Sequence, residues 1–180
     1  MPEILVDTYN SEGVCFYWDQ RASVHVHTSD ATVMVCGNRY FMMSFAKQMI
    51  YLASNDFCLP VGTHLHYDCS FGRNCFGEEL ILELSPARNR DIMLDADEQL
   101  FVNLTLPSTL DDLHQHWHIN AEISVSSDDS VCIKANHRGL LFMATALLVL
   151  TENCDAGFYR CNGQHLPGWT GHDIIFSLSR

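Results

Sequence analysis

The segment Gly37–Asn55, "GNRYFMMSFAKQMIYLASN", is echoed 98 residues later by Ala135–Asn153, "ANHRGLLFMATALLVLTEN". The two segments align without a gap from Val33–Asn55 onto Val131–Asn153. Their matched apolar positions follow helical spacing, at 42, 45, 46, 49 and 50 in the first and at 140, 143, 144, 147 and 148 in the second. This pattern predicts two corresponding α-helices, over about 39–54 and 137–153.

Each predicted helix follows an alternating strand, "TVMVC" or "SVCIK", and an asparagine. Asn38 and Asn136 stand where a helix N-cap is expected, because an Asn side chain accepts a hydrogen bond from an unpaired N–H of the first turn. Both helices are apolar around much of their circumference, which indicates burial against a sheet.

The echo extends to the strands on either side of the helices. "THLHYD" and "FGEELILEL" follow the first helix, as "GFYRC" and "TGHDIIFSL" follow the second. We therefore predict an α+β fold of two pseudo-repeated units of antiparallel strands, each with one core helix, and with both helices packed on one side of the sheet. The units are 1–86 and 87–180, divided near "SPARNRD". We expect them to be fused into one compact body, because a lone half would be marginally stable.

The composition indicates a folded, water-facing chain. Of its 180 residues, 47% are hydrophobic and 18% are charged. No apolar run reaches the ~20 residues of a membrane span, and no basic, then apolar leader opens the chain, so we expect a cytoplasmic protein. The eight cysteines contain no Cys-x-x-Cys pair and are expected to be free thiols.

The net charge is −12, which disfavours nucleic acid and anionic membranes as partners. The segment from Asp91 to Ser130 holds nine carboxylates and no Lys or Arg. Two interpretations remain open: solvated loops, or a negative surface that meets a basic protein. For the second, the candidate partner-binding residues are Asp95, Asp97, Glu98, Asp111, Asp112, Asp128 and Asp129.

Histidines spaced two apart are the main chemical lead. They form three sets, His25 with His27, His64 with His66, and His114, His116 and His118. Residues two apart share a face of a strand, so each set could converge on one metal ion. No complete ligand set of three or four residues is evident, so we predict no metal or other cofactor and keep metal binding, or a metal-dependent enzyme, as the alternative. No nucleotide or hydrolase motif occurs, and we predict no catalytic residues and no enzymatic activity.

The half-unit resembles the immunity proteins of bacterial polymorphic toxin systems. The elements that carry the resemblance are "VCGN", "FMMSFAKQMIYLAS", "THLHYD" and "FGEELILEL" in the first half, and "KAN", "GLLFMATALLVLTEN" and "TGHDIIFSL" in the second. The second copy departs from the pattern at its histidine strand, where only His165 remains. The resemblance implies a small cytoplasmic α+β protein that binds and neutralises a cognate toxin. The acidic charge would suit a toxin with a basic, nuclease-type cleft.

Overall fold

The computed structural model describes residues 3–7, 18–54, 59, 62–68, 74–85, 101–152, 157–164 and 166–179, with the backbone alone at 3–7, 101–105 and 116. No helix within these ranges is long and apolar enough to span a bilayer. The elements are β1 (Glu3–Asp7), β2 (Val24–Ser29), β3 (Thr32–Gly37), α1 (Arg39–Ser54), β4 (His64–Tyr67), β5 (Cys75–Gly77), β6 (Leu80–Leu84), β7 (Phe101–Thr105), the 3₁₀ helix η3 (Asp112–His116), β8 (Ile123–Ser127), β9 (Val131–Ala135), α2 (His137–Glu152), β10 (Phe158–Cys161), β11 (Trp169–Gly171) and β12 (Asp173–Leu178).

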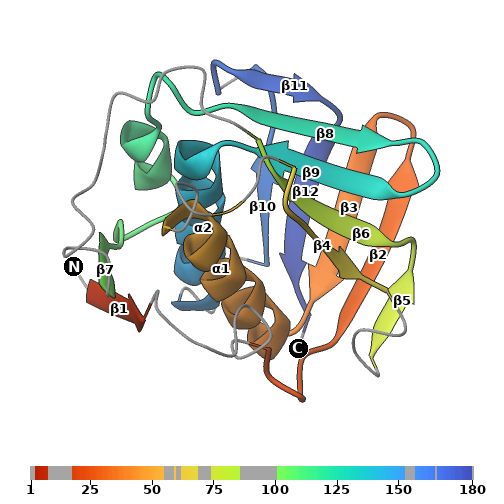
Figure 1. Ribbon diagram of the computed structural model, residues 1–180, viewed down its shortest axis with the longest axis horizontal. Coiled ribbons are helices and arrows are strands. Elements are labelled where there is room, and N and C mark those ends of the chain that lie inside the picture. The colour runs from red at the N-terminus through yellow and green to blue at the C-terminus, as the bar shows by residue number, and fades with distance from the viewer. Residues whose placement is uncertain are drawn as a thin grey trace.

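The two helices form where the repeated segments predict them, with α2 ending one residue earlier than expected. They pack against each other, and both five-stranded sheets lie to one side of the pair (Figure 1). Their apolar side chains join those of the strands in a single buried cluster. The predicted α+β class is confirmed, and the breadth of the apolar surface on each helix is explained by contacts on several sides.

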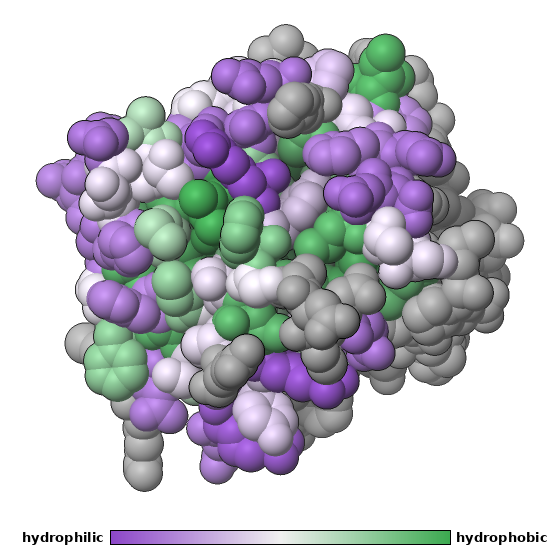
Figure 2. Space-filling view, turned by 180° about the vertical axis from the view of Figure 1, so that it is seen from behind, coloured by the Kyte–Doolittle hydropathy of each residue, from purple (hydrophilic) through white to green (hydrophobic). Residues whose placement is uncertain are grey.

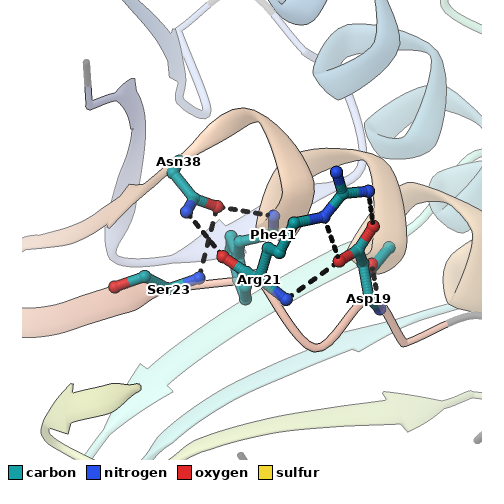
Figure 3. A network of polar contacts seen from close by, with 6 residues as sticks. Asp19, Arg21, Ser23, Asn38 and Phe41 are labelled. Carbon is teal, nitrogen blue, oxygen red and sulfur yellow. Dashed lines mark hydrogen bonds and ion pairs between the residues drawn. The ribbon is translucent and has the colours of Figure 1, made fainter. Parts of the chain in front are cut away.

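Asn38 caps α1 and also ties the helix to the segment before β2 (Figure 3). Its Oδ1 accepts hydrogen bonds from the Phe41 N–H at 2.9 Å and the Ser23 N–H at 3.2 Å. Its Nδ2 donates to the Arg21 carbonyl at 2.8 Å. One side chain therefore satisfies a first-turn donor and fixes the chain that enters the sheet.

Asn136 makes the corresponding bonds at α2. Its Oδ1 accepts from the Gly139 N–H at 2.9 Å and from the Glu122 N–H at 3.2 Å. Its Nδ2 donates to the Asn120 carbonyl at 2.8 Å. The prediction that both asparagines are N-caps is confirmed.

The strands form two mixed sheets, with β1 paired to β7 apart from them. Sheet I has the order β10-β12-β3-β2-β5, and sheet II has the order β4-β6-β9-β8-β11. The expectation of wholly antiparallel strands is wrong. Each sheet joins two antiparallel pairs through a central parallel pair, β12 with β3 in sheet I and β6 with β9 in sheet II.

The parallel pairing arises because strands cross between the two halves of the chain. After α1, β4 and β6 join the β8–β9 hairpin in sheet II, and after α2, β10 and β12 join the β2–β3 hairpin in sheet I. Both sheets thus contain strands from either side of residue 86. The short strands β5 and β11, which the sequence interpretation did not separate from β6 and β12, pair parallel to β2 and β8.

The sequence pattern predicted a strand at "HQHWH", and this prediction is wrong. Residues 112–116 form η3, and Trp117 and His118 follow it outside any strand. Leu113, just before the segment, is buried, and His114 and Gln115 after it are both exposed, which strand alternation would not give. His114, His116 and His118 therefore do not share a strand face.

Candidate binding surface at the turn end of the two sheets

The two sheets are joined at the end that carries their hairpin turns. The connection from β5 to β6 bonds to both sheets, because the Glu78 N–H donates to Val26 in sheet I and the Glu79 carbonyl accepts from Val131 in sheet II, each at 2.9 Å. Both hairpin turns lie toward the right of Figure 1. The fold thus brings these turns to one end of the molecule.

The connection from β11 to β12 makes the reciprocal join. The His172 N–H donates to the Val125 carbonyl at 2.9 Å in sheet II, and the Asp173 N–H donates to the Ala31 carbonyl at 3.0 Å in sheet I. His172 also lies beside the β8–β9 hairpin, with its Nε2 3.3 Å from the Ser127 Oγ. These backbone contacts bring the two connections and the two hairpin turns to the same end of the molecule.

A glycine begins each of these connections for steric reasons. Gly77 has φ +86° and Gly171 has φ +84°, a region that side-chain-bearing residues avoid. A Cβ on either residue would lie 2.0 Å from a carbonyl oxygen, that of Val26 or of Val125. Glycine is therefore required at both positions, and its backbone conformation sets the course of the acidic connection that follows.

We define the acidic rim as the carboxylates of these turns. Glu78 accepts hydrogen bonds from the Thr28 N–H at 2.7 Å and the Thr28 Oγ1 at 2.9 Å. Glu79 lies 2.6 Å from the His66 Nδ1, and Asp173 pairs with Arg160. The acidic rim consists of Asp30, Glu78, Glu79, Asp128, Asp129 and Asp173.

Four rim carboxylates, those of Asp30, Glu78, Asp128 and Asp129, belong to exposed residues. Asp30 has a positive φ of 52°, which Asp tolerates better than most residues. Arg160 offsets part of the rim's charge by pairing with Asp173. The exposed carboxylates leave a negative potential that a cationic partner can reach.

The structure separates the predicted partner-binding residues. Asp128 and Asp129 form the β8–β9 turn and belong to the rim, whereas Asp111 and Asp112 lie at η3, near α2 and away from that turn (Figure 1). The Asp112 carboxylate accepts a hydrogen bond from the Thr109 Oγ1 at 2.8 Å, which stabilises the start of η3. The remaining predicted residues, Asp95, Asp97 and Glu98, lie outside the described residues.

Sequence reasoning missed four rim residues, because it searched for acidic runs. Asp30 and Asp173 stand singly, and Glu78 and Glu79 were interpreted only as part of a turn. The available signal was the pair of Gly-initiated connections, "GEE" and "GHD", which the repeat places in corresponding positions. Their approach to one another depends on the crossing of strands between the halves.

Two of the three histidine sets share strand faces. The rings of His25 and His27 on β2 lie 5.5 Å apart, and those of His64 and His66 on β4 lie 4.9 Å apart. Among the described residues, no group of three or more His, Cys, Asp or Glu side chains could hold a metal ion. These pairs therefore supply two ligands where a stable site needs three or four.

A cysteine–histidine pair also faces outward on sheet I, where Cys36 lies opposite His25 across β2 and β3. Burial raises the pKa of the Cys36 thiol above its ordinary value. A thiol of raised pKa remains protonated at neutral pH and is a poor nucleophile. The pair thus lacks the feature that nucleophilic catalysis would need.

Comparisons with protein-family models, with curated proteins and with solved structures find no match for this chain.

Proposed function

We propose that the protein is an immunity protein, which binds a bacterial toxin domain in the cytoplasm and neutralises it stoichiometrically, without catalysis of its own. The observation that carries the proposal is the acidic rim, where turns of both halves of a chain of net charge −12 meet at one accessible end. The resemblance of the half-unit to such immunity proteins supports it independently.

The proposed target is a basic domain of the nuclease type. A toxin that acts on nucleic acid needs a positive cleft to hold phosphates, and a negative protein surface competes for that cleft. Opposite charges also accelerate encounter, which suits an inhibitor that must act before the toxin does. The same negative charge disfavours nucleic acid itself as the partner.

The decisive experiment uses the domain at the C-terminal end of the protein encoded by the adjacent reading frame. Expression of that domain alone should arrest growth, and co-expression with this chain should restore growth and yield a purified 1:1 complex. Arrest that the wild-type chain does not relieve would overturn the proposal.

The position of the charge is tested by matched single reversals. Asp128→Lys, on the rim, should slow association roughly 3–10-fold at low salt and reduce its salt dependence, with less effect on dissociation. Asp111→Lys makes the same charge change beside η3 and is the control, because η3 lies against α2 and away from the β8–β9 turn (Figure 1). Stopped-flow binding at several salt concentrations measures both, and equal slowing by the two variants would remove the rim from its assigned role.

A further inference from the structure

The outer face of sheet I carries an exposed phenylalanine on each of its two edge strands. One row across the sheet runs Phe158, Ser177, Cys36, His25 and Phe76, one residue on each strand. The terminal residues of this row are large and open to solvent, since Phe158 is 65% exposed and Phe76 is 58% exposed.

A second row of the same face is apolar at its centre. Ile175 and Met34 lie opposite each other on β12 and β3, and both are half-buried. Viewed from behind, the surface over these strands shows apolar residues in green among polar ones (Figure 2). Two exposed aromatic rings and the apolar residues of the second row form a surface whose exposure to water is unfavourable, and burying it against a partner would be favourable.

Sheet II shows that the fold does not require this apolar surface. The corresponding row on its outer face is His64, Glu83, Lys134, Ser124 and Thr170. Lys134 Nζ donates to Glu83 Oε1 at 2.6 Å, so that this face neutralises its own charges. The next row of sheet II is apolar at its centre, with Ile81 opposite Cys132, so the two faces differ mainly in the exposed phenylalanines at the edges of sheet I.

The apolar face continues into the acidic rim. Asp173 is on the outer side of β12, two residues before Ile175, and Asp30 follows the end of β2. Four inter-strand spacings separate the strands of Phe158 and Phe76, or about 19 Å, and three alternating residues extend about 13 Å along a strand. The resulting area of about 250 Å² is well below the ~800 Å² that each partner of a stable complex buries. A partner must therefore cover more than this face, and the adjoining rim supplies charged surface of the required kind.

We propose that the outer face of sheet I is the apolar centre of the toxin-binding surface, with Phe158 and Phe76 as its anchors and the acidic rim as its charged margin. The partner is a protein domain that presents an apolar patch bordered by Lys or Arg. This inference rests on the proposed function and specifies the surface that performs it. The arrangement matches known interfaces, in which aromatic residues contribute most of the affinity and charged margins direct encounter.

The test compares like changes on the two sheets. Phe158→Asp and Phe76→Asp should each weaken binding of the toxin domain about 30-fold or more, the effect of losing an interface hot spot. His64→Asp and Thr170→Asp, at the corresponding positions of sheet II, should change the dissociation constant less than about twofold. Phe158→Ser removes the ring without adding charge and should weaken binding in the same direction. Thermal unfolding of each free variant establishes that it is folded.

The outcomes separate the surface from the function. If wild-type protein binds and the phenylalanine variants bind within twofold of it, the function stands and the sheet I surface is wrong. If the wild-type chain does not bind, the proposed function fails and this inference fails with it. If the free wild-type chain sediments as a dimer that Phe158→Asp converts to monomer, the occupant is a second copy of this chain and the inference is overturned.

Discussion

Sheet I and sheet II have the same strand order and the same pairing directions, and their outer faces differ. Residues that the backbone requires recur in both, such as the two capping asparagines and the two glycines of positive φ. Outward side chains recur less, since Ile175 corresponds to Ile81, but Cys36 stands in one row where Lys134 stands in the other. The comparison indicates that the recurring residues maintain the fold and that the divergent ones are available for recognition.

The largest effect is expected at the recurring glycines. Gly77→Ala and Gly171→Ala should each lower the free energy of unfolding by roughly 3 kcal/mol or more, because each combines a strained φ with a contact to a backbone oxygen. Urea unfolding measures the loss. Gly157→Ala is the control, since a Cβ there has no neighbour within 4 Å, and its effect should be below about 0.5 kcal/mol. Losses at Gly77 or Gly171 as small as the control's would show that the two connections do not need glycine.

The next effect is expected at the capping asparagines. Asn136 is 3% exposed and Asn38 is half-buried, so leaving their partners unpaired should cost more at α2. We expect Asn136→Ala to cost roughly 2–4 kcal/mol and Asn38→Ala roughly 1–2 kcal/mol of stability in urea unfolding.

Asn38→Asp is the matched control for the cap. It keeps the oxygen that accepts from Phe41 and Ser23 and removes the donor to the Arg21 carbonyl, so its loss should be smaller than that of Asn38→Ala. A reversed order of the two alanine variants would contradict the role of burial in this comparison.

The helices and their caps could be predicted because their signals are local. Apolar spacing and a preceding Asn are contained within about 20 residues. The parallel pairing of β3 with β12 could not be predicted, because the alternation in "TVMVC" is compatible with several neighbouring strands. This pairing places Val35 beside Phe176, 141 positions away in the sequence. The strand prediction for "HQHWH" was wrong because it rested on the alternation of histidines alone. Apolar residues do not alternate with them, and the buried Leu113 lies just before the segment.

The candidate surface was only partly predictable for the same reason. Asp128 and Asp129 were identified from an acidic run, but Asp30 and Asp173 join them through contacts between distant segments. The apolar outer face of sheet I was also hidden. Its row takes residues from five strands, and each strand on its own shows ordinary alternation.

A smaller effect is expected where the two sheets diverge. Exchanging the residues of the corresponding positions, by Lys134→Cys in sheet II or Cys36→Lys in sheet I, should change the free energy of unfolding by less than about 1 kcal/mol. The Lys134–Glu83 pair is at the surface, with side chains 46% and 24% exposed, and surface ion pairs add little stability. Thermal and urea unfolding measure both variants. A cost above about 2 kcal/mol would show that the fold itself requires the divergence, which would weaken the assignment of sheet I to recognition.

The smallest effect concerns two titrating side chains that precede β2 and β8. Asp19 Oδ1 accepts the Arg21 N–H at 2.9 Å, and His118 Nδ1 accepts the Asn120 N–H at 3.1 Å. The side-chain hydrogen bond from Arg21 lowers the pKa of Asp19 from 3.8 to about 2 (Figure 3). Burial, followed by the charge of Arg138, lowers the pKa of His118 below 6.5.

Both shifts mean that the folded chain binds fewer protons than the unfolded chain, so stability should rise with pH through each window. The Asp19 contribution is present above pH 3.8 and is lost as the pH falls through about 2, and the His118 contribution declines as the pH falls below 6.5. NMR titration should show the Asp19 carboxyl changing near pH 2, and Arg21→Ala should return its pKa toward 3.8. Arg138→Ala should raise the pKa of His118 without moving that of Asp19, because the charges that shift Asp19 are those of Arg21 and Lys47. A wild-type Asp19 that titrates near its ordinary value would show that the Arg21 contact does not persist in solution and would remove this point of correspondence between the halves.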